Sequence, residues 1–162
     1  MRHTKKLLSL TAVLIMAACT DNTLTNPFQN AVGTYQLTVY AGRSIPATYT
    51  IQPGDPTYPN GATFVVTDGD LVLNSNGTFI ETNNYVTTPT GGTGQQSSFV
   101  SSGTWTGSGT TIVLNAPAQN GNVARSVTGT LTFDSARNVY VFNYQEDNGA
   151  GGLDSFEYQS AR

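Results

Sequence analysis

The chain has 162 residues, with ten Asp and Glu against seven Lys and Arg. Arg2, Lys5 and Lys6 account for three of these cations, so residues 19–162 hold four arginines against ten carboxylates, a net charge of −6 that disfavours nucleic-acid binding. Residues 19–162 also contain no His, no Lys and one Cys, which excludes a Ser-His-Asp triad, a histidine zinc site, lysine Schiff-base chemistry and internal disulfides.

Residues 1–18 have the organisation of a secretory signal. A basic start precedes an apolar run over residues 7–18, which is shorter than the roughly 20 residues that span a bilayer. The run ends Ala17-Ala18-Cys19, with small side chains where a signal peptidase cuts.

This ending resembles a bacterial lipoprotein signal peptide, although Met16 stands where that motif commonly has Leu. The resemblance implies cleavage after residue 18 and acylation of Cys19, with chains such as palmitate. Two or more acyl chains hold a protein firmly on a membrane. The alternatives are an ordinary secretory signal or a short uncleaved anchor.

Residues 19–32 are polar, rich in turn-forming residues and without periodicity, so we interpret them as the lipidated Cys and a flexible tether. Thr20, rather than Asp, follows Cys19. By resemblance to lipoprotein sorting in Gram-negative bacteria, this favours a lipid-anchored position in the cell envelope, at the outer membrane.

Residues 33–162 alternate between apolar and polar side chains, which is typical of half-buried strands. No segment has a convincing helical period. We predict strands over residues 33–40, 47–52, 62–67, 70–74, 77–87, 97–106, 110–115, 125–133, 138–145 and 153–159.

Turn-forming residues separate these strands. Asn74-Ser75-Asn76-Gly77 predicts a hairpin because Asn-Gly readily adopts positive φ. Turns are also expected over residues 107–109 and 134–138, and Asp68-Gly69 is interpreted as a further turn. The fold class is therefore all-β: an antiparallel up-and-down meander closing into an 8–10 stranded barrel, with a two-sheet β-sandwich as the alternative.

Three stretches resemble the bacterial lipocalin-like lipoproteins: residues 33–48, beginning Gly33-Thr34-Tyr35, residues 70–79 and residues 102–110. The resemblance implies a lipocalin-like barrel over residues 33–162. It implies little about function, since most members of that family are uncharacterised. Tyr35 also stands where true lipocalins have a signature Trp.

Aromatic residues are the main candidates for ligand contacts. We consider twelve aromatic residues of the predicted strands: Tyr35, Phe64, Phe79, Tyr85, Phe99, Trp105, Phe133, Tyr140, Phe142, Tyr144, Phe156 and Tyr158. They either fill a closed core or surround one small ligand. We select six as candidate ligand-binding residues: Tyr35, Phe79, Trp105, Phe133, Tyr140 and Phe142.

Two carboxylate groupings offer weaker hypotheses. Asp147 and Asp154 flank a glycine-rich loop that resembles one calcium-binding repeat, but such repeats need tandem copies. Asp68 with Asp70, or Glu81 with a neighbour, would be needed for a glycosidase pair, and nothing in the sequence predicts the burial that raises a carboxyl pKa.

We therefore expect a lipid-anchored β-barrel of the cell envelope that binds a small apolar ligand inside the barrel. The alternative is a filled barrel that serves as a structural or protein-interaction module of the envelope. We expect no enzymatic activity and no cofactor. The expected partners are the membrane, through the acyl anchor, and a small apolar ligand or an envelope protein.

Overall fold

A computed structural model describes residues 30–118, 123–148 and 151–161. The predicted signal peptide, Cys19 and residues 20–29 of the predicted tether lie outside the described residues. Ten strands follow one another along the chain: β1 (Gly33–Tyr40), β2 (Arg43–Ser44), β3 (Ala47–Ile51), β4 (Ala62–Leu73), β5 (Thr78–Pro89), β6 (Gln95–Ser108), β7 (Thr111–Ala116), β8 (Arg125–Asp134), β9 (Val139–Asp147) and β10 (Leu153–Ser160). Among the described residues, no helix is long and apolar enough to cross a membrane.

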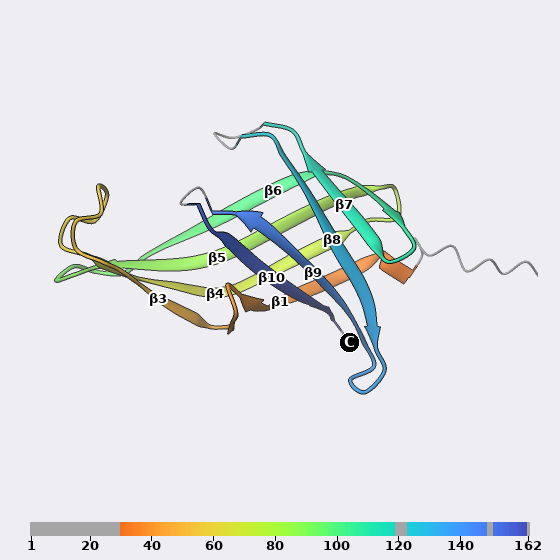
Figure 1. Cartoon of the computed structure of the whole chain (residues 1–162), viewed down its shortest axis with the longest axis horizontal. Coiled ribbons are helices and arrows are strands. Elements are labelled where there is room, and N and C mark those ends of the chain that lie inside the picture. Colours follow the sequence, from red (N-terminus) through yellow and green to blue (C-terminus); the bar gives the residue numbers. More distant parts are fainter. Residues whose placement is uncertain (1–29, 119–122, 149–150, 162) are drawn as a thin grey trace, which may run out of the picture.

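The strands form a closed antiparallel barrel in meander order (Figure 1). From β4 to β10 each strand pairs with the next, and β1 then pairs with both β10 and β4. Eight strands therefore close the barrel, while β2 and β3 extend it at one end. This confirms the all-β barrel and rules out the open two-sheet sandwich.

The two ends of the barrel differ. One end, which we call the turn end, carries the start of β1 and the short turns after β4, β6 and β8. Gly77, Gly109 and Asn138 occupy these turns with positive φ, so the predicted hairpins are confirmed. The other end, which we call the loop end, carries the longer connections after β3, β7 and β9. In Figure 1 the loop end points left and the turn end points right.

Two of the predicted strands are one strand. Residues 62–67 and 70–74 belong to the continuous β4, which has a β-bulge between Val66 and Asp68. The predicted turn at Asp68-Gly69 is therefore wrong. Gly69 is instead buried in the strand, where a Cβ atom would overlap the Asn83 side chain of β5.

A second bulge changes the orientation of β1. Tyr35 and Leu37 face the interior, but the register shifts between Leu37 and Val39. Strict alternation would place Val39 inside. Because of the bulge, Tyr40 packs against the core instead.

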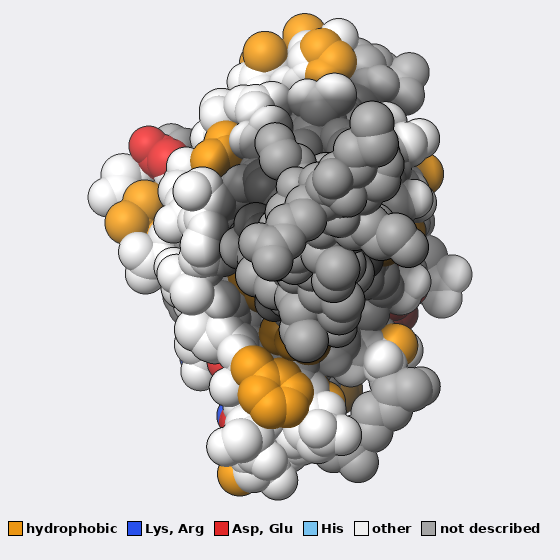
Figure 2. Space-filling model, turned by 90° about the vertical axis from the view of Figure 1, so that its right-hand side faces the viewer, with side chains coloured by type: hydrophobic (Ala, Val, Ile, Leu, Met, Phe, Trp, Pro, Cys, Tyr) orange, Lys and Arg blue, Asp and Glu red, His pale blue; other side chains and the backbone are white. Residues whose placement is uncertain are grey.

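The core is densely filled toward the turn end. Tyr35, Leu73, Phe79 and Phe142 are each at most 1% exposed there. Ala31, just before β1, is fully buried, and its carbonyl accepts a 2.8 Å hydrogen bond from the Tyr35 hydroxyl. The described chain therefore joins the barrel at the turn end. Figure 2 views this end, whose described surface shows isolated hydrophobic groups and few charged ones.

Candidate functional site

The interior is hollow toward the loop end, where a cavity of about 260 Å³ lies between β4–β6 and β9–β10. Six of its ten lining side chains are aromatic, and three of the others are polar or charged. The lining residues are Tyr40, Phe64, Val66, Asn83, Tyr85, Phe99, Arg125, Tyr144, Glu146 and Phe156.

The register of β9 and β10 orders one wall of this cavity. Tyr144 lies opposite Phe156, and their rings stack with centroids 4.6 Å apart. One step nearer the loop end, Glu146 lies opposite Asp154. Side chains two residues apart on a strand share a face, so the wall changes from stacked rings to paired carboxylates toward the mouth.

The bulge in β1 completes the wall with Tyr40. Its ring meets that of Phe156 edge to face at 5.1 Å and that of Tyr49 at 5.5 Å. Its hydroxyl donates a 2.5 Å hydrogen bond to Asp154 Oδ2. Burial, and then this bond to a carboxylate, raise the pKa of Tyr40 well above its usual value.

A buried polar network forms the floor of the cavity, centred on Glu81 of β5. Glu81 has no exposed surface. Its Oε2 atom accepts from Arg125, while its Oε1 atom accepts from the Tyr144 and Tyr158 hydroxyls, the latter at 2.7 Å. The Tyr158 hydroxyl also lies 2.9 Å from Asn83 Oδ1. The network thus joins β5, β8, β9 and β10 across the interior.

Arg125, the first residue of β8, donates a hydrogen bond from each of its three side-chain nitrogens within this network. Its three nitrogens donate to Glu81, to Glu146 at 2.7 Å and to the Tyr144 hydroxyl at 2.9 Å. Burial by itself lowers the pKa of the guanidinium, but the Glu81 charge, Tyr144 and the hydrogen bonds to Glu81 and Glu146 together outweigh it, so the Arg125 pKa is raised. The arginine is therefore permanently charged.

The buried tyrosines keep their protons to high pH. Burial, followed by the negative charge of Glu81, raises the pKa of Tyr144 and of Tyr158 well above the usual value. Both hydroxyls are therefore available as hydrogen-bond donors to Glu81 at any physiological pH.

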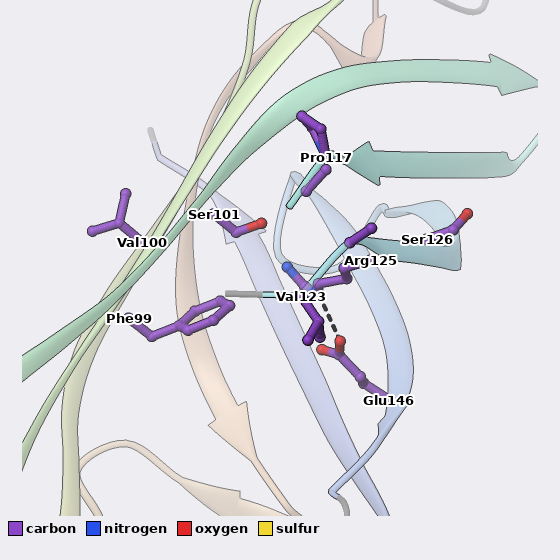
Figure 3. A pocket seen from close by; sticks show the side chains of 10 residues that line it. Phe99, Val100, Ser101, Pro117, Val123, Arg125, Ser126 and Glu146 are labelled. Atoms are coloured by element: carbon purple, nitrogen blue, oxygen red, sulfur yellow. Dashed lines mark hydrogen bonds and ion pairs between the residues drawn. The ribbon is translucent and has the colours of Figure 1, made fainter. Parts of the chain in front are cut away.

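A second cavity of about 400 Å³ adjoins the first. It shares Phe99, Arg125 and Glu146 with the first cavity and extends to Pro117 and Val123 on the loop-end side of β7 and β8. Figure 3 shows Phe99 of β6 and Glu146 of β9 both directed toward Arg125. The arginine network therefore forms the boundary between the two spaces.

None of the six residues selected from the sequence lines the 260 Å³ cavity. Tyr35, Phe79, Trp105 and Phe142 are buried in the packed core, where Trp105 Nε1 donates a 2.9 Å hydrogen bond to the Asn74 carbonyl. The other two pack together at the turn end: the rings of Phe133, which is 52% exposed, and Tyr140 lie 5.1 Å apart. Five of the other six aromatic residues considered in the sequence line the cavity: Phe64, Tyr85, Phe99, Tyr144 and Phe156.

The structure places the carboxylates considered for a glycosidase pair on different faces of the sheet. Asp68 and Asp70 are exposed on the outer face of β4, and Asp68 accepts a hydrogen bond from Asn84. Of Asp68, Asp70 and Glu81, only Glu81 faces the interior. Asp154 is held by Tyr40 and, at 3.4 Å, by Asn148. Within the described part of the chain, no group of three or more acidic, His or Cys side chains is arranged to hold a metal ion, and the calcium loop stays a prediction.

Four contributors to the site were missed from the sequence: Tyr40, Asn83, Arg125 and Glu146. Strand parity could have found two of them, because residues separated by an even number share a face of the strand. Asn83 shares its face with Phe79, and Glu146 shares its face with Tyr144. The same rule could have found a third, Arg125, which shares its face of β8 with the buried Val127. Tyr40 had no such signal, since its position depends on the bulge.

Comparisons of the chain with protein-family models, with curated proteins and with solved structures found no match.

Proposed function

We propose that this protein is a lipid-anchored lipoprotein of the cell envelope, of the lipocalin-like kind, which binds a small apolar ligand inside its barrel. The observation that carries the proposal is the aromatic-lined cavity at the loop end, in a barrel whose other half is solid. Ligand sites are typically concave, mostly apolar and furnished with a few polar groups that fix orientation.

The volume suits a small molecule. A cavity of about 150 Å³ is enough to hold benzene, so the 260 Å³ cavity has room for a substituted ring or a short branched chain. The adjoining 400 Å³ space shares Phe99, Arg125 and Glu146 and would accommodate a longer ligand.

We propose binding rather than catalysis for this site. Both oxygens of Glu81 accept hydrogen bonds from permanent donors, and the carboxylate has no exposed surface. A general acid or base must be within hydrogen-bond reach of the proton it moves. Glu81 meets protein groups on both oxygens, so its arrangement is that of a structural acceptor.

The position of the chain start agrees with anchoring. Ala31 is buried at the turn end, so the described chain begins at that end of the barrel. The cavity lies toward the opposite end. A lipid on Cys19, with the outer membrane as its proposed site, is compatible with a cavity at the end opposite the first described residues.

The alternative function, a filled barrel that contacts another envelope protein, is favoured by one observation. Val123 is 83% exposed and Leu153 is 63% exposed, and both lie at the loop end. A contiguous exposed apolar patch marks a protein-interaction site, and the alternative requires that these two side chains belong to one such patch. This alternative needs no ligand.

Fluorine NMR with benzotrifluoride, a small neutral apolar probe, tests ligand binding. We expect a saturable change of the probe signal with the purified protein. Val66→Trp, on the cavity wall, should abolish it by filling the space, whereas Val72→Trp, on the outer face of the same strand, should leave it unchanged. Absence of a saturable signal with the unmodified protein would contradict the proposal.

A further inference from the structure

The charged groups around the cavity select among apolar ligands, and we propose that the ligand is a small organic cation: an amine or quaternary ammonium carried on an aromatic or aliphatic body. This inference rests on the proposed function, because it requires that the 260 Å³ cavity holds a ligand. Three features carry it: an arginine already paired with two carboxylates, a further carboxylate bonded to the lining residue Tyr40, and an aromatic wall.

Arg125 is the cation of the lining, and three of its five N–H donors are already engaged by protein oxygens. Its Nε, Nη1 and Nη2 atoms each donate to a protein oxygen. Its guanidinium also lies 5.6 Å from the ring centroid of Phe99 and 5.5 Å from that of Tyr144. A ligand carboxylate would have only the remaining Nη hydrogens to accept from, on a guanidinium whose charge Glu81 and Glu146 already compensate.

The lining itself holds one cation and one carboxylate, Arg125 and Glu146, but two further carboxylates, Glu81 and Asp154, contact lining residues from behind. Arg125 faces Glu81 and Glu146, and Asp154 lies directly across from Glu146 in the β9–β10 register. Like charges directly opposite each other destabilise an antiparallel pair. A positive group between Glu146 and Asp154 would relieve this repulsion, whereas a fatty-acid carboxylate would add to it.

Arg43 does not add a positive charge to the cavity lining. Arg43 of β2 is exposed, packs at 4.7 Å over the ring of Tyr49 and donates to the Thr48 carbonyl. It is absent from the cavity lining. It therefore lies behind Tyr49, one aromatic ring away from Tyr40.

The aromatic wall adds a further attraction. Tyr40, Phe64, Tyr85 and Phe156 line the cavity, and the faces of such rings carry the negative part of the quadrupole. A cation over an aromatic face gains about 0.5–2 kcal/mol, more as water is excluded. A quaternary ammonium combines this attraction with an apolar surface, which the same wall accepts.

Protein-detected NMR titration with three matched probes tests the inference. Benzyltrimethylammonium carries the charge, neopentylbenzene replaces its nitrogen with carbon, and 3-phenylpropanoate carries the opposite charge. We expect the cation to bind about ten times more tightly than the neutral probe, in line with the strength of partly desolvated cation–π contacts. The carboxylate should bind least.

Charge-neutralising variants identify the groups responsible. Glu146→Gln and Asp154→Asn should each reduce the preference for the cation several-fold, since each keeps an acceptor oxygen for Arg125 or Tyr40. Asp70→Asn, which makes the same charge change on the outer face of β4, should leave it unchanged. If neopentylbenzene binds as tightly as the cation, the proposal of a cationic ligand is contradicted, whereas the proposal of an apolar ligand site is supported. If none of the three probes nor benzotrifluoride binds, both proposals fail.

Discussion

Glu81 of β5 and Arg125 of β8 form an ion pair inside the barrel, between strands that are not neighbours in the sheet. The glutamate is fully buried, and 9% of the arginine side chain is exposed. Removing two charges from water is costly, and the pair meets that cost with hydrogen bonds from Tyr144 and Tyr158 to Glu81 and from Arg125 to Glu146. Within the described residues no buried side-chain polar atom lacks a partner.

Removing one member of the pair should destabilise the protein strongly. Glu81→Ala leaves the Arg125 charge buried without its main partner, and we expect a loss of about 3–5 kcal/mol in the free energy of unfolding. The double variant Glu81→Leu/Arg125→Met removes both charges and should recover much of that loss. Denaturant unfolding measures both. A loss below about 1 kcal/mol for the single variant, the range of exposed pairs, would contradict a buried pair.

Stability should fall in alkaline solution above pH 10. The folded-state pKa of Tyr35 is raised to about 12 by burial and by Tyr140, and burial and Glu81 also raise those of Tyr144 and Tyr158 well above the usual value. The unfolded chain therefore loses these protons first, and stability present below pH 10 is lost as the pH rises. Each such tyrosine contributes a slope of about 1.4 kcal/mol per pH unit.

Two measurements check this alkaline behaviour. Denaturant unfolding between pH 8 and pH 12 gives the stability, and tyrosinate absorbance gives the ionisation of the folded protein. We expect a fraction of the tyrosines to ionise only as the protein unfolds. Complete ionisation near pH 10 with the fold intact would show that these hydroxyls are not buried.

Gly129 allows β8 and β9 to pack closely at the core. A Cβ atom there would overlap the ring of Phe142, which is fully buried. Gly129→Ala should cost about 1–3 kcal/mol of stability by overpacking. Thr128→Ala, on the exposed face next to it, should cost much less. Equal thermal unfolding temperatures for the two variants would be inconsistent with this packing.

The sequence predicts the hairpins and the barrel because those follow from local chemistry. Asn76-Gly77 specifies its turn through the backbone alone, and strand alternation is visible on either side. Strand parity also places Glu81 on the same face as Phe79. A charged residue is nevertheless assigned to the solvent by default, and its partner Arg125 lies 44 residues away.

The cavity could not be predicted, since it depends on the two β-bulges. Each bulge shifts the parity of its strand by one residue, at Leu37/Val39 in β1 and at Val66/Asp68 in β4. The first brings Tyr40 to the cavity, and the second lets Phe64 and Leu71 both face inward. A bulge depends on how two partner strands pair, so the sequence of one strand alone does not predict it.

Membrane attachment should depend on Cys19. Cys19→Ala removes the acylation site of the proposed lipoprotein, and nothing in the acidic domain favours anionic lipids. We expect the variant to move from the membrane to the soluble fraction, with Cys19→Ser behaving alike. Fractionation followed by immunodetection measures this. Retention of both variants in the membrane fraction would contradict an acyl anchor.

Native mass spectrometry of the protein purified from its own host tests the central claim most directly. If the loop-end cavity holds a small ligand, the gently ionised protein should carry a reproducible mass above that of the covalent chain, and denaturation should release it. The released mass would identify the ligand, including whether it bears a positive charge. A native mass equal to the covalent mass, with no saturable binding of the small apolar probes, would show that the barrel acts as a filled module.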